Sequence, residues 1–139
     1  TAISHQRAAM ELAIELNDLD TEGRCYGALG ASFQEVEQYQ TASRYMEKSV
    51  EIFMHTGDLG GMLVAYANMG GLYSLLKDYR MAIEYQAKAL ELAQRIGNRD
   101  MESRILISLQ DSAKEAGEKS MLDEYKKRYL EIAGDFSRT

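Results

Sequence analysis

Two stretches of the sequence, forty residues apart, decide the fold. The first reads YGALGASFQEVEQYQTASRY and covers residues 26–45, and the second reads YANMGGLYSLLKDYRMAIEY and covers residues 66–85. Both place glycine, alanine and tyrosine at the same offsets. The identical pairs are Tyr26/Tyr66, Gly30/Gly70, Tyr39/Tyr79, Ala42/Ala82 and Tyr45/Tyr85. Self-similarity at a period of 20–50 residues is typical of repeat architectures, so we expect an array of one repeated unit.

The same register extends towards both ends of the chain. Upstream, residues 2–13 match residues 82–93; downstream, the match fades, and Gln110 stands where Gly30 and Gly70 do. Terminal repeats of such arrays are usually atypical. The sequence therefore predicts a single repeat domain over 1–139. Its parts are a half repeat at 1–18, repeats at 19–58 and 59–98, and a degenerate or terminal repeat at 99–135.

Each unit is predicted to be a pair of helices. In the second unit Leu63, Tyr66, Met69 and Tyr73 recur at intervals of three or four residues, which is the spacing of one helical face. Gly97 is predicted to end a helix in a left-handed conformation. Predicted helices cover about 2–16, 21–36, 39–55, 60–76, 79–96, 100–116 and 119–133. No strand is predicted, and the short linkers make neighbouring helices antiparallel, which gives an all-α fold.

Small residues inside the predicted helices indicate close packing. Glycine in a helix interior costs about 1 kcal/mol relative to alanine. A glycine kept at both Gly30 and Gly70 therefore implies that another helix approaches too closely for a side chain. Ala42 and Ala82, on the second helices, are interpreted in the same way.

Composition excludes several classes of protein. The 139 residues carry a formal net charge of −6, which argues against a nucleic-acid binder. No apolar run reaches the length of about 20 residues that a membrane span needs, so no membrane insertion is expected. The single cysteine excludes an internal disulfide and fits a reducing compartment, so we expect a cytoplasmic, intracellular protein.

No residue pattern indicates catalysis, a metal or a cofactor. His5 and His55 do not pair with Cys25 at any metal-ligand spacing. The glycine-rich segment 57–61 lacks the Lys-Ser/Thr that follows a phosphate-binding loop, and an inter-repeat turn explains it better. The carboxylates are scattered, with no isolated acid pair for acid–base chemistry. We therefore expect no catalytic, cofactor-binding or metal-binding residue and no enzymatic activity.

The repeated positions resemble the tetratricopeptide repeat family. They are Leu29-Gly30 and Met69-Gly70, Phe33 and Tyr73, Tyr39 and Tyr79, Ala42 and Ala82, and Ala89. The forty-residue period is similar to that of G-protein-signalling modulators of the mitotic spindle and of kinesin light chains. The resemblance implies a right-handed superhelical solenoid whose first helices line a concave groove. The chain departs from the family in having no proline, which the family often places between repeats.

The resemblance also implies which positions face the groove. On the first helix of each unit they are Arg24, Gly27, Ala28, Ala31, Gln34 and Glu35; then Val64, Ala67, Asn68, Gly71, Ser74 and Leu75; then Arg104, Ile107, Ser108, Asp111, Lys114 and Glu115. Relatives that grip a C-terminal carboxylate use Lys, Arg and Asn there. Here small or apolar residues replace most of them, so a carboxylate clamp is disfavoured because the buried charge would lack a partner.

The row of small residues admits two interpretations. Gly27, Ala31, Ala67 and Gly71 would let an extended segment or a helix of a partner approach closely. Alternatively, they only permit tight curvature of the superhelix. We favour partner binding, and hence an interaction module or scaffold. The alternatives are a peptide-sensing regulatory domain of a larger signalling protein and a self-associating assembly module.

The first predicted helix matches the second helix of a unit, since Thr1 aligns with Thr41. Its apolar residues Ile3, Met10, Ala13 and Ile14 are expected to lack a covering helix. Either the chain is a piece of a longer superhelix, which we favour, or a second copy covers this face by self-association.

Overall fold

The computed structural model describes the backbone of residues 1–138 and the side chains of residues 1–134; Thr139, which the predicted domain includes, lies outside the described residues. The helices are α1 (Ala2–Glu15), α2 (Leu19–Glu35), α3 (Tyr39–Thr56), α4 (Leu59–Leu75), α5 (Tyr79–Ile96), α6 (Arg99–Ala116) and α7 (Lys119–Arg138). The described part of the chain contains no strand, and the predicted all-α class is confirmed. Helix ends lie within two residues of prediction, except that α7 continues five residues beyond 133.

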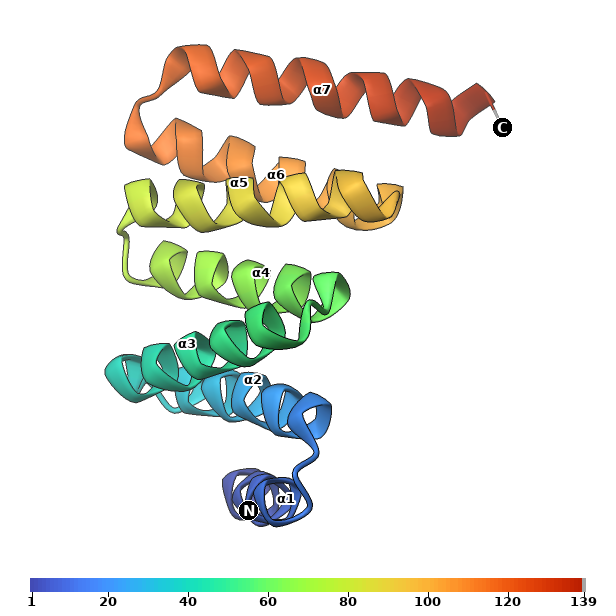
Figure 1. Cartoon of the computed structure of the whole chain (residues 1–139). Coiled ribbons are helices and arrows are strands. Elements are labelled where there is room, and N and C mark those ends of the chain that lie inside the picture. Colours follow the sequence, from blue (N-terminus) through green and yellow to red (C-terminus); the bar gives the residue numbers. More distant parts are fainter. Residues whose placement is uncertain (139) are drawn as a thin grey trace.

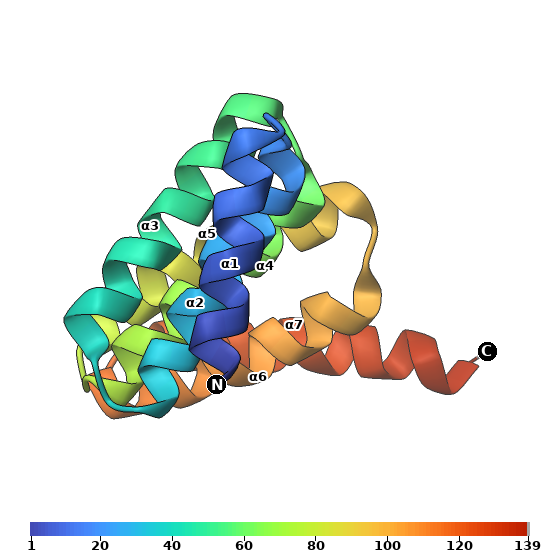
Figure 2. The same cartoon turned by 90° about the horizontal axis from the view of Figure 1, so that it is seen from below.

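The helices stack one after another along a single direction. Figure 1 shows α1 at one end of the stack and α7 at the other, with each helix running back across its predecessor. The pairs α2–α3 and α4–α5 form the tightest neighbours, and α3 packs on α4 as α5 packs on α6. Seen from below, the last turns of α7 extend past the other helices (Figure 2). The architecture is a helical solenoid, as the repeat predicts.

Local signals fix where the helices begin and end. The side chains of Asp18, Asp58, Asp78 and Asn98 each accept the backbone N–H three residues into the following helix, as N-caps do. Gly97 ends α5 at φ 80°, in the left-handed conformation that the sequence predicts. Gly57 and Gly117 end α3 and α6 in the same way.

Close helix packing at the repeated glycines is confirmed. A Cβ atom on Gly30 would lie 2.6 Å from Met46 Cγ, and one on Gly70 would lie 2.7 Å from Gln86 Cγ. Both distances are shorter than real Cβ contacts, so helices α2 and α3, and likewise α4 and α5, meet where no side chain fits. Ala42 and Ala82 are fully buried at the same contacts.

The core consists of two clusters of buried residues along the stack, and a pair of stacked aromatic rings recurs in the two repeats. The rings of Phe33 and Tyr45 stack with centroids 5.5 Å apart, and those of Tyr73 and Tyr85 stack at 5.6 Å. The ammonium of Lys88 lies 5.2 Å from the Tyr85 ring centroid, within cation–π range. These ring pairs join the two helices of each repeat.

The end helices correct one expectation. Ala13 is buried, and Ile3 and Met10 pack partly buried against the core beside α2, so these three residues are not left uncovered. Helix α1 does expose Ile14, together with Leu12, and Leu16 follows it exposed. The three lie outside the packed seam because an α-helix of this length buries only one stripe of its surface.

No helix among the described residues is long and apolar enough to cross a membrane.

Candidate functional site

Eleven of the eighteen predicted groove residues line one of two hollows. The α2–α4 cavity is lined by Arg24, Gly27, Ala28, Ala31, Val64 and Asn68 among them. A second hollow, the α4–α6 pocket, is lined by Gly71, Ser74, Ser108, Asp111 and Glu115 among them. The remaining predicted residues line neither hollow: Gln34, Glu35, Ala67, Leu75, Arg104, Ile107 and Lys114. The structure thus divides one predicted row into two places of different chemistry.

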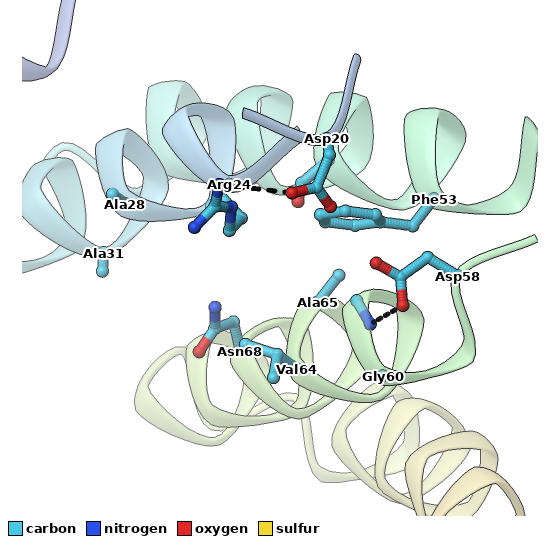
Figure 3. Close-up of a pocket in the computed structure, with 13 residues that line it drawn as sticks. Asp20, Arg24, Ala28, Ala31, Phe53, Asp58, Gly60, Val64, Ala65 and Asn68 are labelled. Carbon is cyan, nitrogen blue, oxygen red and sulfur yellow. Dashed lines mark hydrogen bonds and ion pairs between the residues drawn. The ribbon is translucent and has the colours of Figure 1, made fainter. Parts of the chain in front are cut away.

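The α2–α4 cavity has an apolar floor. Its volume is about 560 Å³, within the range of ligand-binding clefts. Phe53 and Ala65, both buried, form the floor together with Gly27 and Gly61. Figure 3 shows the Phe53 ring projecting from α3 into the space between α2 and α4. Val64 and Ala31 stand exposed at its margin.

Beside the cavity, large and small side chains stand at exchanged positions in the two repeats. A Cβ atom on Gly23 would lie 2.8 Å from Phe53 Cζ, and one on Gly61 would overlap the Phe53 ring. Forty residues later, the corresponding positions hold Leu63, Ala93 and Met101. The first repeat therefore places its bulk in Phe53, between two helices that carry no side chain there, and the second repeat does the reverse.

Polar groups surround the mouth of the cavity. The Arg24 guanidinium lies 3.2 Å from the Asp20 carboxylate, and both side chains are more than half exposed. Asp58 Oδ1 accepts the Gly61 N–H at 3.0 Å. Asn68 points from α4 towards α2 (Figure 3), and its half-buried amide makes no hydrogen bond within residues 1–134. An unused amide can donate and accept at once, which suits a peptide backbone.

The cavity floor was missed at the sequence level. Phe53, Ala65, Gly60 and Gly61 lie outside the groove positions that the family resemblance implies. The signal was present, because Phe53 aligns with Ala93, and Gly61 aligns with Met101. Opposite changes in size at aligned positions indicate compensation, but only coordinates show that the side chains meet.

The α4–α6 pocket is smaller and polar. It has a volume of about 260 Å³, and buried Gln86 of α5 forms part of its lining. Ser112 Oγ donates to Gln86 Oε1 at 2.9 Å, and Gln86 Nε2 donates to Ser74 Oγ at 3.5 Å. Both the oxygen and the nitrogen of the amide are therefore used within the fold, and the hydrogen bonds at this pocket connect α4, α5 and α6.

Metal-ligating and nucleophilic side chains are dispersed over the described residues. Among the described residues no group of three His, Cys, Asp or Glu side chains is placed to hold a metal ion. Burial raises the pKa of the Cys25 thiol, so the unreactive thiol form predominates at neutral pH. His5 Nδ1 lies 2.8 Å from the Thr1 carbonyl oxygen on its own helix.

Comparison with protein families finds a match in the second repeat. Residues 63–95 match the model of the tetratricopeptide repeat, within the repeat predicted at 59–98. No curated protein matches the sequence.

Several solved structures share the fold. BtubC (BKLC) from P. vanneervenii superposes with a TM-score of 0.88 at 19% identity, over 97% of this chain and 56% of BtubC. The apo form of RapI gives 0.87 at 19% identity, over 96% of this chain and 37% of RapI. A Rap protein in complex with Competence and Sporulation Factor gives 0.87 at 15% identity, over 97% of this chain and 38% of Rap. The chain thus spans 56% of the length of BtubC and less than 40% of the length of each Rap protein.

Proposed function

This chain is a tetratricopeptide-type repeat protein, and on that premise we propose that it is a non-catalytic interaction module that binds a peptide segment of a partner protein. One observation carries the proposal. The α2–α4 cavity combines an apolar floor with an unused amide, that of Asn68, on the face where such a solenoid is expected to bind. Apolar clefts with a few convergent polar groups are the default binding sites of proteins.

The small residues beside the cavity suit an extended segment. Three residues project little or nothing above the surface of their helices: Gly27 and Ala31 on α2, and Gly71 on α4. A Cβ atom on Gly71 would meet nothing within 4 Å. A peptide backbone could therefore lie close to both helices, within reach of the Asn68 amide. Main-chain hydrogen bonds would give affinity, and the cavity would select a side chain.

The charges along this face argue against capture of a peptide carboxylate. The predicted groove holds the guanidinium groups of Arg24 and Arg104 on α2 and α6. Each lies 3.2 Å from a carboxylate four residues earlier on its own helix, Asp20 and Asp100 respectively. A bound carboxylate would have to compete with these ion pairs. The structure thus supports the sequence-based argument against a carboxylate clamp.

A peptide-sensing role in a larger signalling protein is the second candidate. The fold matches the Rap complex with Competence and Sporulation Factor, and also a signal-transduction ATPase from Pyrococcus horikoshii with a tetratricopeptide repeat sensor. The latter superposes with a TM-score of 0.80 at 23% identity, over 96% of this chain and 22% of the ATPase. Both candidates use the same cavity, and the single, half-buried cysteine fits an intracellular setting for either.

A peptide selection tests the proposal on the 139-residue chain. A phage-displayed library of random dodecapeptides is selected against the wild-type chain, and enriched peptides are titrated by fluorescence anisotropy. Val64→Arg at the cavity margin should weaken binding by at least about tenfold, since it places a charge over an apolar cleft. Gly71→Arg tests the same face further along α4, where the added side chain meets open space.

The matched control is Val36→Arg. Val36 is 53% exposed and Val64 55% exposed, and Val36 lies between α2 and α3 without lining the cavity. Equal helicity of both variants by circular dichroism excludes unfolding. Failure to enrich any peptide, or equal binding to the Val64 and Val36 variants, would overturn the proposal. Light scattering of the wild-type chain separately tests self-association: a monomer at high concentration contradicts it.

A further inference from the structure

Resting on the proposed function, we infer that the bound segment carries a large apolar side chain, which enters the α2–α4 cavity, next to a basic residue at the cavity mouth. The first part follows from the floor of the cavity and the second from the charges around its mouth. Each part has its own test.

The floor favours an apolar group. Phe53, Ala65, Gly27 and Gly61 offer carbon surface, and the one side-chain hydroxyl below the mouth is that of Ser49. Ser49 Oγ is buried and donates to the Gly23 carbonyl at 2.8 Å, so its hydrogen is already used. A polar side chain inserted here would lose its water and gain no donor in exchange, which is costly. The volume of about 560 Å³ leaves room for an aliphatic or aromatic side chain.

The mouth favours a positive charge. The ionisable residues that line the cavity are two carboxylates, Asp20 and Asp58, and one guanidinium, Arg24. Arg24 already pairs with Asp20 at 3.2 Å. Asp58 uses only Oδ1, which accepts the Gly61 N–H, and no described residue forms an ion pair with it. Asp58 and Phe53 line the same cavity (Figure 3), so the carboxylate would be within reach of a basic side chain next to the anchor.

Asp58 can be tested without damage to the helix that it caps. Asn98 occupies the same place forty residues later, and its Oδ1 accepts the Met101 N–H at 3.1 Å. Asp58 does the same for Gly61 at 3.0 Å. Asparagine and aspartate are equally good N-caps, so Asp58→Asn removes the charge and keeps the cap.

The experiment compares two selections from the random dodecapeptide library. Peptides enriched on the wild-type chain should share a Leu, Met, Phe, Tyr or Trp with Lys or Arg within two positions of it. Peptides enriched on Asp58→Asn should keep the apolar residue and lose the preference for a basic neighbour. For the tightest wild-type peptide, replacing the basic residue with Gln should weaken binding about three- to fivefold to the wild type, the range of an exposed ion pair, and hardly at all to Asp58→Asn.

Two further measurements keep both parts open to refutation. Replacing the apolar residue of the same peptide with Ala should weaken binding at least about tenfold for both chains, as loss of a buried anchor does. Raising the salt concentration from 50 to 500 mM should weaken wild-type binding more than binding to Asp58→Asn, because salt screens exposed charges.

The outcomes separate the inference from the proposed function. A shared pattern without an apolar residue, or a basic preference that Asp58→Asn leaves intact, overturns the inference while Val64→Arg can still confirm groove binding. Loss of all enrichment, or indifference to Val64→Arg, instead overturns the proposed function.

Discussion

The first repeat (α2 and α3) and the second repeat (α4 and α5) have helices of equal length, 17 and 18 residues, yet they fill the space between them differently. Phe53 of α3 meets Gly23 of α2 and Gly61 of α4, whereas the aligned residue of α5 is Ala93, and Leu63 of α4 and Met101 of α6 stand at the aligned glycine positions. Because interiors are close-packed, the same backbone spacing tolerates either arrangement but not a mixture. A cavity of about 560 Å³ lies beside the first arrangement, with Phe53 and Gly61 in its lining.

The largest expected loss of stability comes from removing the Phe53 side chain. Phe53→Ala should destabilise the chain by about 3–5 kcal/mol, because both glycines facing the ring leave the resulting space empty. The triple change Gly23→Leu, Phe53→Ala and Gly61→Met copies the second repeat and should recover most of the loss. Urea unfolding followed by circular dichroism measures both.

The control is Gly23→Leu in the presence of Phe53. Its side chain meets the ring, so this variant should be destabilised as well. If the triple variant is no more stable than Phe53→Ala, the two repeats are not volume-equivalent.

A second difference lies between consecutive repeats. Gln6 accepts from Ser32 Oγ at 2.8 Å, and Gln86 accepts from Ser112 Oγ at 2.9 Å, each across 26 residues. At the intervening junction the corresponding residues are Met46 and Leu72, both fully buried. At this position each junction thus holds either a polar pair or an apolar pair.

Removing one partner of the Gln86–Ser112 hydrogen bond should reduce stability less than Phe53→Ala does. Ser112→Ala leaves the buried Gln86 oxygen without its donor and should cost about 1–2 kcal/mol. The double change Gln86→Met and Ser112→Leu copies the apolar junction and should be more stable than Ser112→Ala, by chemical denaturation. A double variant that is the less stable one would show that the junctions cannot be interchanged.

The turns at Lys77 and Gly97 differ in residue type, and changes there should affect stability less. Gly97 at φ 80° and Lys77 at φ 60° both adopt the left-handed conformation, one without and one with a side chain. Gly97→Ala should cost about 1–2 kcal/mol, since a Cβ atom is strained there. Lys77→Gly should change stability by less than about 0.5 kcal/mol, because relief of strain and the greater freedom of the unfolded glycine nearly cancel. Thermal unfolding of both variants checks the difference.

The smallest expected effect concerns the caps of α2 and α6. The Thr21 hydroxyl, at 2.6 Å, and the Thr21 N–H hold the pKa of Asp18 below its ordinary value of 3.8. A lowered pKa stabilises the fold above that ordinary value, and the contribution is lost as the pH falls through the lower folded value. Asp18→Asn should therefore lose less melting temperature than the wild type between pH 5 and pH 2.5. Asn98 at α6 already has this uncharged form, and a wild-type-like profile for Asp18→Asn would contradict the assignment.

The helices were predictable because their signals are local. Apolar spacing marked each helix, and Gly97 marked the end of α5. The predicted end of α7, at residue 133, was wrong, because the structure continues the helix to Arg138. The close approach at Gly30 and Gly70 was also predictable, since a costly residue retained at one repeat position needs a structural reason.

The candidate site was predictable only in part. The family resemblance implied the groove positions on α2 and α4. Six of them line the cavity: Arg24, Gly27, Ala28, Ala31, Val64 and Asn68. Phe53 was not found, because its role depends on Gly23 and Gly61, which lie 30 residues before it and 8 residues after it. Gln34 and Ile107 were included because the family resemblance places them in the groove, and they line neither hollow.

By itself, the sequence determined the period, the helices and their order, because these depend on intervals of a few residues and on a repeat that aligns with itself. Only the tertiary structure decided where that regular stack is hollow. A cavity is the space left after side chains from three helices have packed, and its size depends on their volumes together. No one-dimensional pattern sums those volumes, so the place of Phe53 between two glycines became evident only in three dimensions.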